Sequence, residues 1–419
     1  MFCAAVGDIA AQNFDVAPAL RRHVEYLSSD ALQGRKAGSE GERKAAAYLH
    51  SELEKAGVVM LTDVSGQDFT IDYGGEKVSS LNIVGIVEGS DPRLREEYIV
   101  VGAHLDNIGT HSMTVNGQKV TQVYPGADDN ASGVAMMIEL AGMVAANSWA
   151  FPRSVIFVGF GAQECGMAGS WYFVNRAFEQ IGQVKAMVDL DMLGRGNDAN
   201  PFQIFSQVDA SALSAFMKKV AEQPVVTAPV RAQGALAPSD YLPFYERKIP
   251  VVLFTTGMTH EYHTVKDTPS LVLYNHMARN SCYIYHFISC LSSQEDVFAR
   301  ETKVLKATAE TIYSPSDCDK RPQFFHSDEQ HFLDAWVYKY IKYPKAALRN
   351  GIMGQVLVGF IVEKDGRVTN VEVVKGVDDD LDDEAVKVIS VSPKWIPGEV
   401  AGRKVRTRII LPVEFRLRQ

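Results

Sequence analysis

The sequence predicts a large α/β domain, a three-layer sandwich with a mostly parallel central sheet, followed by a small α+β domain. Over the first three-quarters of the chain, short apolar and β-branched runs alternate with helical patterns, as in α/β sandwiches. A break containing Ser314-Pro315-Ser316-Asp317 follows. Beyond it, helix and strand patterns include an Asp-Gly pair between alternating runs, which indicates a hairpin.

In the first domain, a surface helix is predicted from Gly41 through Leu53, and Gly57 stops it. Short, largely apolar runs then predict strands that are buried on both faces. These strands are 81–88, 98–102, 155–160, 186–190 and 251–254. Helical patterns lie between several of them, at 132–146, 167–177, 211–222 and 270–288.

Four segments are predicted along the chain. Residues 1–16 form a leader remnant or an N-terminal extension, because they combine an apolar patch with small residues but lack a basic start. The large domain spans 17–291, a charged helical linker spans 292–317, and the small domain spans 318–419. In the small domain the expected order is helix, two hairpin strands, acidic helix and strand, at 329–341, 354–363, 368–374, 378–389 and 405–415.

Composition excludes several classes of function. The net charge of −9 and the lack of a basic run interleaved with aromatic residues argue against a nucleic-acid partner. No apolar run approaches the ~18 residues of a membrane helix, so no membrane span is predicted. The five cysteines are scattered and form no CxxC pair, which argues against a disulfide framework and against a thiolate zinc site.

Nitrogen and oxygen ligands follow the predicted strands. His104 comes after strand 98–102, and Asp106 lies on the same side of an extended chain, where its carboxylate could orient the imidazole. The adjacent acids Asp128 and Asp129 open the helix 132–146. Asp and Asn also cap helices, so this pair fits a purely structural role as well.

Three further ligands complete the set. Glu164 follows strand 155–160, Asp191 shares one face of its strand with Asp189, and His263 follows strand 251–254. A buried acid can pair with an arginine or with backbone amides instead of a metal. Taken together, however, two imidazoles and three carboxylates at one sheet edge suit a pair of zinc ions that share one carboxylate. Such a pair generates a hydroxide near neutral pH, which is hydrolase chemistry.

The local sequences of these clusters and their order along the chain resemble those of the M28 family of zinc aminopeptidases over about residues 17 to 291. The matching stretches are Leu32-Gln33-Gly34-Arg35, Gly102 to Asp106, Pro125 to Gly133, Glu164 to Ser170, Leu190-Asp191-Met192, Ser239-Asp240 and Tyr262 to Thr268. The resemblance implies the zinc-peptidase fold, a peptide substrate and removal of N-terminal residues. It also implies two zinc ions, with Asp129 bridging them and Asp106 orienting His104. The implied metal ligands are His104, Asp129, Glu164, Asp191 and His263.

The general-base position departs from the family pattern. Where the family has a glutamate immediately before the ligand glutamate, this chain has Gln163. An amide can hold a water but cannot take its proton at neutral pH. A natural binding-only relative, an engineered trap and a substitute base are the alternatives. An inactive zinc- and peptide-binding protein and a glutaminyl-cyclase-like transferase are therefore alternative functions. Tyr241 stands where many relatives have histidine, a change at the substrate pocket.

The tail, about Cys318 to Gln419, resembles the C-terminal domain of TonB and similar periplasmic modules. The match includes Tyr343-Pro344, Gly351 to Val358, Asp365 to Val368, Leu381 to Ala385, Pro393 to Gly398 and Pro412 to Phe415. The resemblance implies a periplasmic or cell-envelope location and an envelope partner that docks by strand addition. A stabilising appendage is the alternative.

Overall fold

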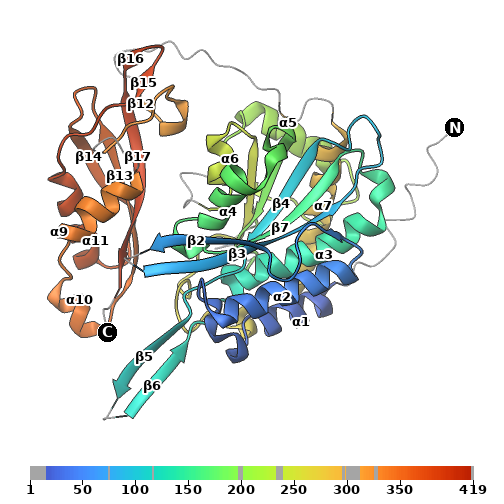
Figure 1. Ribbon diagram of the computed structural model, residues 1–419, viewed down its shortest axis with the longest axis horizontal. Coiled ribbons are helices and arrows are strands. Elements are labelled where there is room, and N and C mark those ends of the chain that lie inside the picture. The colour runs from blue at the N-terminus through green and yellow to red at the C-terminus, as the bar shows by residue number, and fades with distance from the viewer. Residues whose placement is uncertain are drawn as a thin grey trace. The chain divides into compact units, whose positions relative to one another are not determined.

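The computed structural model describes residues 16–73, 76–115, 118–196, 202–232, 239–294, 298, 312–324 and 329–416. The chain divides into two compact units, residues 1–300 and 301–419 (Figure 1). Of the predicted N-terminal extension, only the last residue lies within the described ranges, and most of the predicted helical linker lies outside them. Residues Ile312–Tyr313, predicted as helical, form strand β12 because they pair with another strand. The finer segment boundaries stay a prediction.

A twisted sheet of nine strands forms the centre of the first unit, in the order β1-β3-β7-β4-β8-β11-β9-β10 with β2 beside β3. Its central run β7-β4-β8-β11 is parallel. β3 runs antiparallel to its neighbours, and β9 runs antiparallel to β11 but parallel to β10. The mostly parallel sheet is therefore confirmed. The strands are β1 (Val59–Met60), β2 (Gln67–Tyr73), β3 (Glu76–Val87), β4 (Tyr98–His104), β7 (Ser154–Phe160), β8 (Val184–Leu190), β9 (Gln203–Ser206), β10 (Val230–Arg231) and β11 (Val251–Thr255).

Helices cover both faces of this sheet, which gives the three layers (Figure 1). Alternate residues of β4 enter different cores: Ile99 and Val101 pack on one face and Val100 on the other. The first face carries α1 (Ala17–Leu27), α2 (Glu40–Lys55), α3 (Gly133–Ala146), α5 (Ala210–Ala221) and α7 (Tyr274–Ser293). The second carries α6 (Leu242–Glu246) and the helical turn Phe173–Ala177, which continues from α4 (Ala168–Tyr172).

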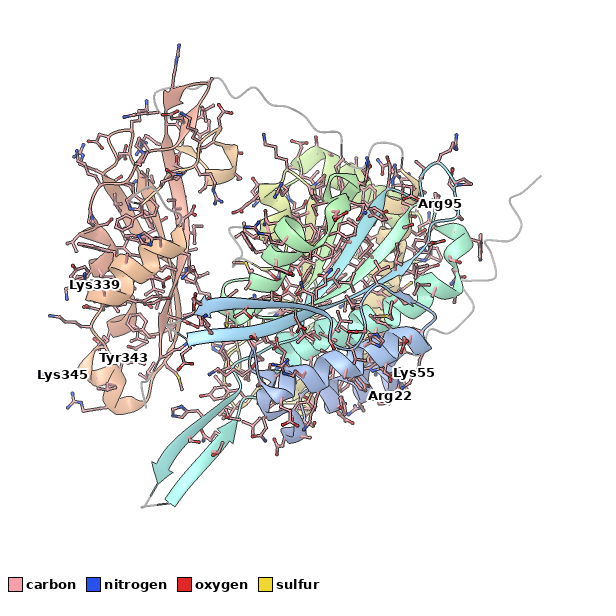
Figure 2. The ribbon with its side chains drawn as sticks, viewed as in Figure 1. Arg22, Lys55, Arg95, Lys339, Tyr343 and Lys345 are labelled. Carbon is pink, nitrogen blue, oxygen red and sulfur yellow. The ribbon has the colours of Figure 1, made fainter. Side chains whose placement is uncertain are left out.

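The outer surface of α1 and α2 is charged. Arg22 and Lys55 lie on the outside of these helices (Figure 2), and their side chains are 62% and 66% exposed. Buried Leu20, Val24 and Leu49 face the sheet instead. Across the described ranges, no helix is both long and apolar enough to cross a bilayer.

Two hairpins were not predicted. Strands β2 and β3 pair with each other along a two-stranded extension of the sheet. Strands β5 (Thr110–Val115) and β6 (Gln118–Val123) form a separate ribbon that projects from the first unit (Figure 1). Their sequences are rich in threonine, serine and glutamine, so they lack the apolar runs on which the strand assignment rested.

The second unit has a four-stranded sheet in the order β12-β17-β13-β14. Its main elements are α8 (Glu329–Phe332), α9 (Tyr338–Tyr340), α10 (Lys345–Asn350), β13 (Gly354–Val362), β14 (Val368–Lys375), α11 (Asp379–Ser390) and β17 (Arg406–Phe415), with a small β15 (Glu399–Val400) and β16 (Arg403–Lys404) pair. The aromatic core centres on Trp395, whose ring lies 4.8 Å from Phe332 and 5.7 Å from Phe360. Lys339 and Lys345 are exposed on the outside of α9 and α10 (Figure 2).

The predicted Asp-Gly turn joins β13 to β14. Gly366 has a φ of +83° and is buried against Trp395, whose N–H donates to its carbonyl at 2.8 Å. A Cβ at this position would collide with the carbonyl oxygen of Trp395. The turn therefore requires glycine both for its backbone angle and for the space.

We expect Gly366→Ala to destabilise the second unit by roughly 3 kcal/mol, because backbone strain and a collision with a rigid carbonyl add together. Gly402→Ala is the matched control, since Gly402 also has a positive φ of 72° but no atom within 4 Å of an added Cβ. That variant should lose only about 1 kcal/mol. Calorimetry of the full chain measures both, and equal losses would contradict the packing role.

Candidate metal centre

The parallel strands bring the predicted ligands to one edge of the sheet. His104 is the last residue of β4, and Asp191 directly follows the neighbouring strand β8. Glu164 lies in a short helical turn after β7, the neighbour of β4 on its other side. Because parallel strands end at the same edge, these three side chains start close together. His263 arrives from the loop after β11, and Asp129 from the turn before α3.

The carboxylate of Asp129 lies between the two histidines. Its Oδ1 is 3.3 Å from Nε2 of His104, and its Oδ2 is 3.1 Å from Nε2 of His263. Asp191 Oδ1 completes the first set at 3.6 Å from His104 Nε2, and Glu164 Oε1 completes the second at 3.0 Å from His263 Nε2. Two three-residue groups that can hold a cation therefore share Asp129.

The electrostatics of the cluster are dominated by burial and acids. Burial opposes the charge on His263, but the charge of Glu164 and its contact with Asp129 raise the pKa of this imidazole to about 10. The pKa of His104 is likewise raised, since Asp129 and Asp191 outweigh burial. Burial disfavours the ionised form of Asp129, yet the two imidazoles lower its pKa. The site thus stabilises positive charge at the positions of both imidazoles.

Asp106 acts on a different group from the one predicted. Nδ1 of His104 lies 3.1 Å from the backbone carbonyl of Asp106, whereas the carboxylate oxygen is 3.9 Å away and too far for a hydrogen bond. The carboxylate instead accepts from the N–H groups of Gln163 at 2.8 Å and Glu164 at 3.1 Å. The chain folds back after β4, so the carbonyl orients the imidazole and the side chain holds the Glu164 loop.

Buried side-chain acceptors bind the four N–H groups of residues 161–164, the segment that ends at Glu164. Asn82 Oδ1 accepts from Gly161 N at 3.2 Å, and Glu42 accepts from Ala162 N. Asp106 then accepts from the next two amides. Burial and the charge of Asp106 raise the pKa of Glu42 to about 8. Four successive N–H groups are thereby fixed before the ligand carboxylate of the loop reaches the centre.

The backbone of Asp129 is held at its N–H group by Asp267 and at its carbonyl by Asn107. Asp267 accepts from the N–H groups of Asp128 and Asp129, each at 3.0 Å, and receives a hydrogen bond from Arg195 at 3.2 Å. The side-chain nitrogen Nδ2 of Asn107 donates to the carbonyl of Asp129 at 2.5 Å and to Asp129 Oδ2 at 3.2 Å. These contacts fix the direction of the shared carboxylate.

Asp189 in β8 and Asp191 directly after it have different partners. Asp191 Oδ2 accepts from the hydroxyl of Ser239 at 2.9 Å, which leaves its Oδ1 for the centre. Asp189 is buried and accepts from the N–H of Tyr241 at 3.0 Å, and burial raises its pKa. The segment Ser239–Tyr241 is therefore docked onto this strand.

Several supporting residues escaped the sequence analysis: Arg35, Glu42, Asn107 and Asp267. Each is polar and buried, and each contacts a backbone group distant in the sequence. Arg35 and Asp267 lie inside stretches that match the family pattern, Leu32 to Arg35 and Tyr262 to Thr268. A charged residue within such a matching stretch could have indicated a buried structural role. Asn107 and Glu42 carried no such signal, because one sits in a loop and the other in an ordinary helix.

Gln163 lies next to the ligand Glu164, at the start of the short turn after β7. Its backbone is held by Asp106, and its side chain is partly buried. Gln163 is therefore adjacent to a candidate ligand on a backbone that Asp106 fixes.

Comparisons with known proteins match each of the two units to a separate family. Residues 82–288 match peptidase family M28, and residues 339–417 match the Gram-negative bacterial TonB protein C-terminal domain. A probable leucine aminopeptidase of Arthroderma otae is 27% identical over 262 residues, which cover 59% of this chain and 66% of that protein. An aminopeptidase of Pseudomonas aeruginosa is 33% identical over 132 residues, or 31% of this chain and 21% of that protein.

Among solved structures, LapA of Legionella pneumophila has a TM-score of 0.53 and 25% identity, over 68% of this chain and 76% of that one. The first unit of this chain thus belongs to peptidase family M28, and the second carries a TonB C-terminal domain. The chain spans about two thirds of the fungal relative and about a fifth of the Pseudomonas relative.

We expect Asp106→Asn to weaken zinc binding by about 10- to 100-fold, because an amide nitrogen cannot accept from the loop N–H groups and Glu164 loses its fixed position. Competition with a chelator measures the affinity on the folded chain. Asp68→Asn, an exposed acid on β2, is the control and should bind zinc normally. Wild-type affinity in Asp106→Asn would contradict this role.

Proposed function

We propose that this chain is a zinc-dependent aminopeptidase of the M28 type that binds two zinc ions. One observation carries the proposal: the two oxygens of Asp129 face different imidazoles, each with its own further carboxylate. A lone structural cation does not require a carboxylate divided in this way. His104 and Asp191 would hold one ion, Glu164 and His263 the other, and Asp129 would bridge them.

The donor set fits zinc. Each group offers one imidazole nitrogen and carboxylate oxygens, a set that zinc accepts with a position left open for water or substrate. Metal-ligating imidazoles and carboxylates are usually oriented by a hydrogen bond to a further group. Here the carbonyl of Asp106 orients His104, and the hydroxyl of Ser239 orients Asp191. Manganese and cobalt suit the same donors, so metal content is part of the test.

When bound, such a pair polarises a peptide carbonyl and lowers the pKa of a bound water. The residues of the chain supply the geometry for this chemistry. Asp106 and Glu42 hold the turn that carries Glu164, and Asp267 and Asn107 hold Asp129. The similarity to proteins named aminopeptidases supports removal of residues from the N-terminus.

Gln163 limits the ability of the site to remove a proton from a water molecule. Its side chain can orient a water by donating and accepting hydrogen bonds, but it cannot accept a proton at neutral pH. The expected activity is therefore low, while metal and peptide binding are retained. This residue is the specific reason to keep a peptide-binding protein without turnover as the second candidate.

The second unit supports a cell-envelope location, because its family is that of the Gram-negative TonB C-terminal domain. We place the chain in the periplasm. There the second unit would dock to an envelope protein while the first acts on peptides.

We expect two zinc ions per chain, measured by elemental analysis of the purified protein. Asp191→Asn should retain one ion, because the group formed by Asp129, Glu164 and His263 stays intact. Asp129→Asn should lose both, because each group loses its shared member. A wild-type content of one, or equal losses in the two variants, would contradict the bridging arrangement.

We expect Gln163→Glu to raise kcat on aminoacyl-nitroanilides by about 10²–10⁴-fold at unchanged zinc content, because a carboxylate can accept the proton of the attacking water. Gln180→Glu, an exposed site, is the control for added charge. Chelation should abolish the gained activity.

An inert Gln163→Glu variant that still holds zinc would favour the binding protein over the enzyme. Mass spectrometry of a peptide beginning with glutamine separates the cyclase alternative, since cyclisation releases ammonia and cleavage releases a residue.

A further inference from the structure

A fully buried arginine lies behind the metal centre and takes no part in the chemistry proposed above. Arg35 ends the helical turn Asp30–Arg35 and is 1% exposed. Its guanidinium has five N–H donors, and five backbone carbonyls surround them. The acceptors are Leu105 at 2.9 Å from Nε, Leu27 at 2.5 Å and Pro125 at 2.8 Å from Nη1, and Gly126 at 2.9 Å and Asp129 at 3.5 Å from Nη2.

Four of these carbonyls, those of Leu105, Pro125, Gly126 and Asp129, belong to the two segments that present metal ligands. Leu105 directly follows His104, whereas Pro125 and Gly126 lead into Asp129. The carbonyl of Leu27, at the end of α1, ties the same guanidinium to the helical layer. One planar group thus joins two ligand segments, separated along the chain by the β5–β6 hairpin, to a packed helix.

The backbone of the same turn makes the connection tighter. Asn107 N donates to the carbonyl of Arg35 at 3.1 Å, and Gly109 N donates to the carbonyl of Gly34 at 2.9 Å. A Cβ at Gly126 would lie 2.8 Å from Nη2 of Arg35, so the guanidinium fills the space against this segment. The loop after β4 is therefore held by both the main chain and the side chain of this turn.

Only arginine satisfies this set of acceptors. A lysine has three donors on one atom and cannot reach carbonyls that are spread around a plane. No carboxylate pairs directly with Arg35 among its hydrogen bonds, and its charge is balanced at longer range by Asp129, Asp267 and Asp106. Burial lowers its pKa to about 10, so the group keeps its charge at neutral pH.

We propose that Arg35 is a positioning residue that sets the distance between His104 and Asp129 before metal binds, and thereby the zinc affinity of the centre. The proposal rests on the metal centre proposed above but not on its peptidase activity. It predicts that geometry rather than charge matters, because a lysine keeps the charge and loses the planar set of donors.

The test compares the same substitution at two buried arginines of the full chain. Arg35→Lys should weaken zinc binding at least tenfold by chelator competition and should shift the absorption spectrum of the cobalt-substituted protein, which reports ligand geometry. Arg153→Lys is the matched control, because Arg153 is 2% exposed and donates to the carbonyls of Ser292 and Gln294. It precedes β7, at the opposite end of the parallel strands.

Both variants should lower the unfolding temperature of the metal-free protein, since each removes buried hydrogen bonds. Only Arg35→Lys should change the affinity and the spectrum, with Arg153→Lys binding zinc within twofold of wild type. Wild-type affinity and spectrum in Arg35→Lys, or equal losses of affinity in the two variants, would overturn the proposal.

Hydrogen exchange on the wild-type chain tests the same point if Arg35→Lys does not fold. The amides of Asn107, Gly109 and Ala131 should be protected in the metal-free protein. The first two donate to carbonyls of the Asp30–Arg35 turn, and Ala131 donates to the carbonyl of Gly126, which the guanidinium of Arg35 contacts. Protection that appears only after zinc is added would overturn the proposal. A wild-type chain that binds no zinc would refute the proposed function instead, and the exchange data would still report on the arginine.

Discussion

The division of the Asp129 carboxylate between His104 and His263 is the constraint on which the arrangement of the first unit depends. One short side chain can contact two imidazoles only if its backbone stays fixed and both imidazoles are held at about the same distance from its carboxylate. Asp267, Asn107 and Arg35 meet the first requirement through main-chain hydrogen bonds. The parallel strands meet the second, because they deliver ligands to one sheet edge.

Burying so many acids close together has a cost. Burial raises the pKa of Asp106 to about 6 and of Asp128 and Asp240 to about 7, which means that the fold disfavours their ionised forms. Backbone N–H groups and the buried arginines offset part of this penalty. The remaining excess of negative potential is what a divalent cation neutralises, so the same groups that strain the metal-free fold favour metal binding.

Two different groups of Asp106 perform two different roles, orienting the imidazole of His104 and holding the turn that carries Glu164. Asp106 was predicted to orient an imidazole, and in the fold its backbone carbonyl does so while its carboxylate holds the turn carrying Gln163 and Glu164. That turn is equally well held with glutamine at position 163 as with the family glutamate, because the contacts run through the backbone. In the proposed function, metal binding and proton transfer are therefore separable, because the residue at position 163 holds the turn only through its backbone.

The sequence by itself determined where the central strands β3, β4, β7, β8 and β11 lie along the chain, the helices between them and the residues that stand at the strand ends. It could do so because continuous apolar runs and their ends are local patterns, and parallel strands convert those ends into a single sheet edge. The polar β5–β6 hairpin lacked such a pattern, and so did the buried polar contacts of Arg35 and Asn107. Only the tertiary structure decided these, because the partner of each donor is a backbone carbonyl. Every residue carries such a carbonyl, and only the folded chain selects which one comes within hydrogen-bond distance.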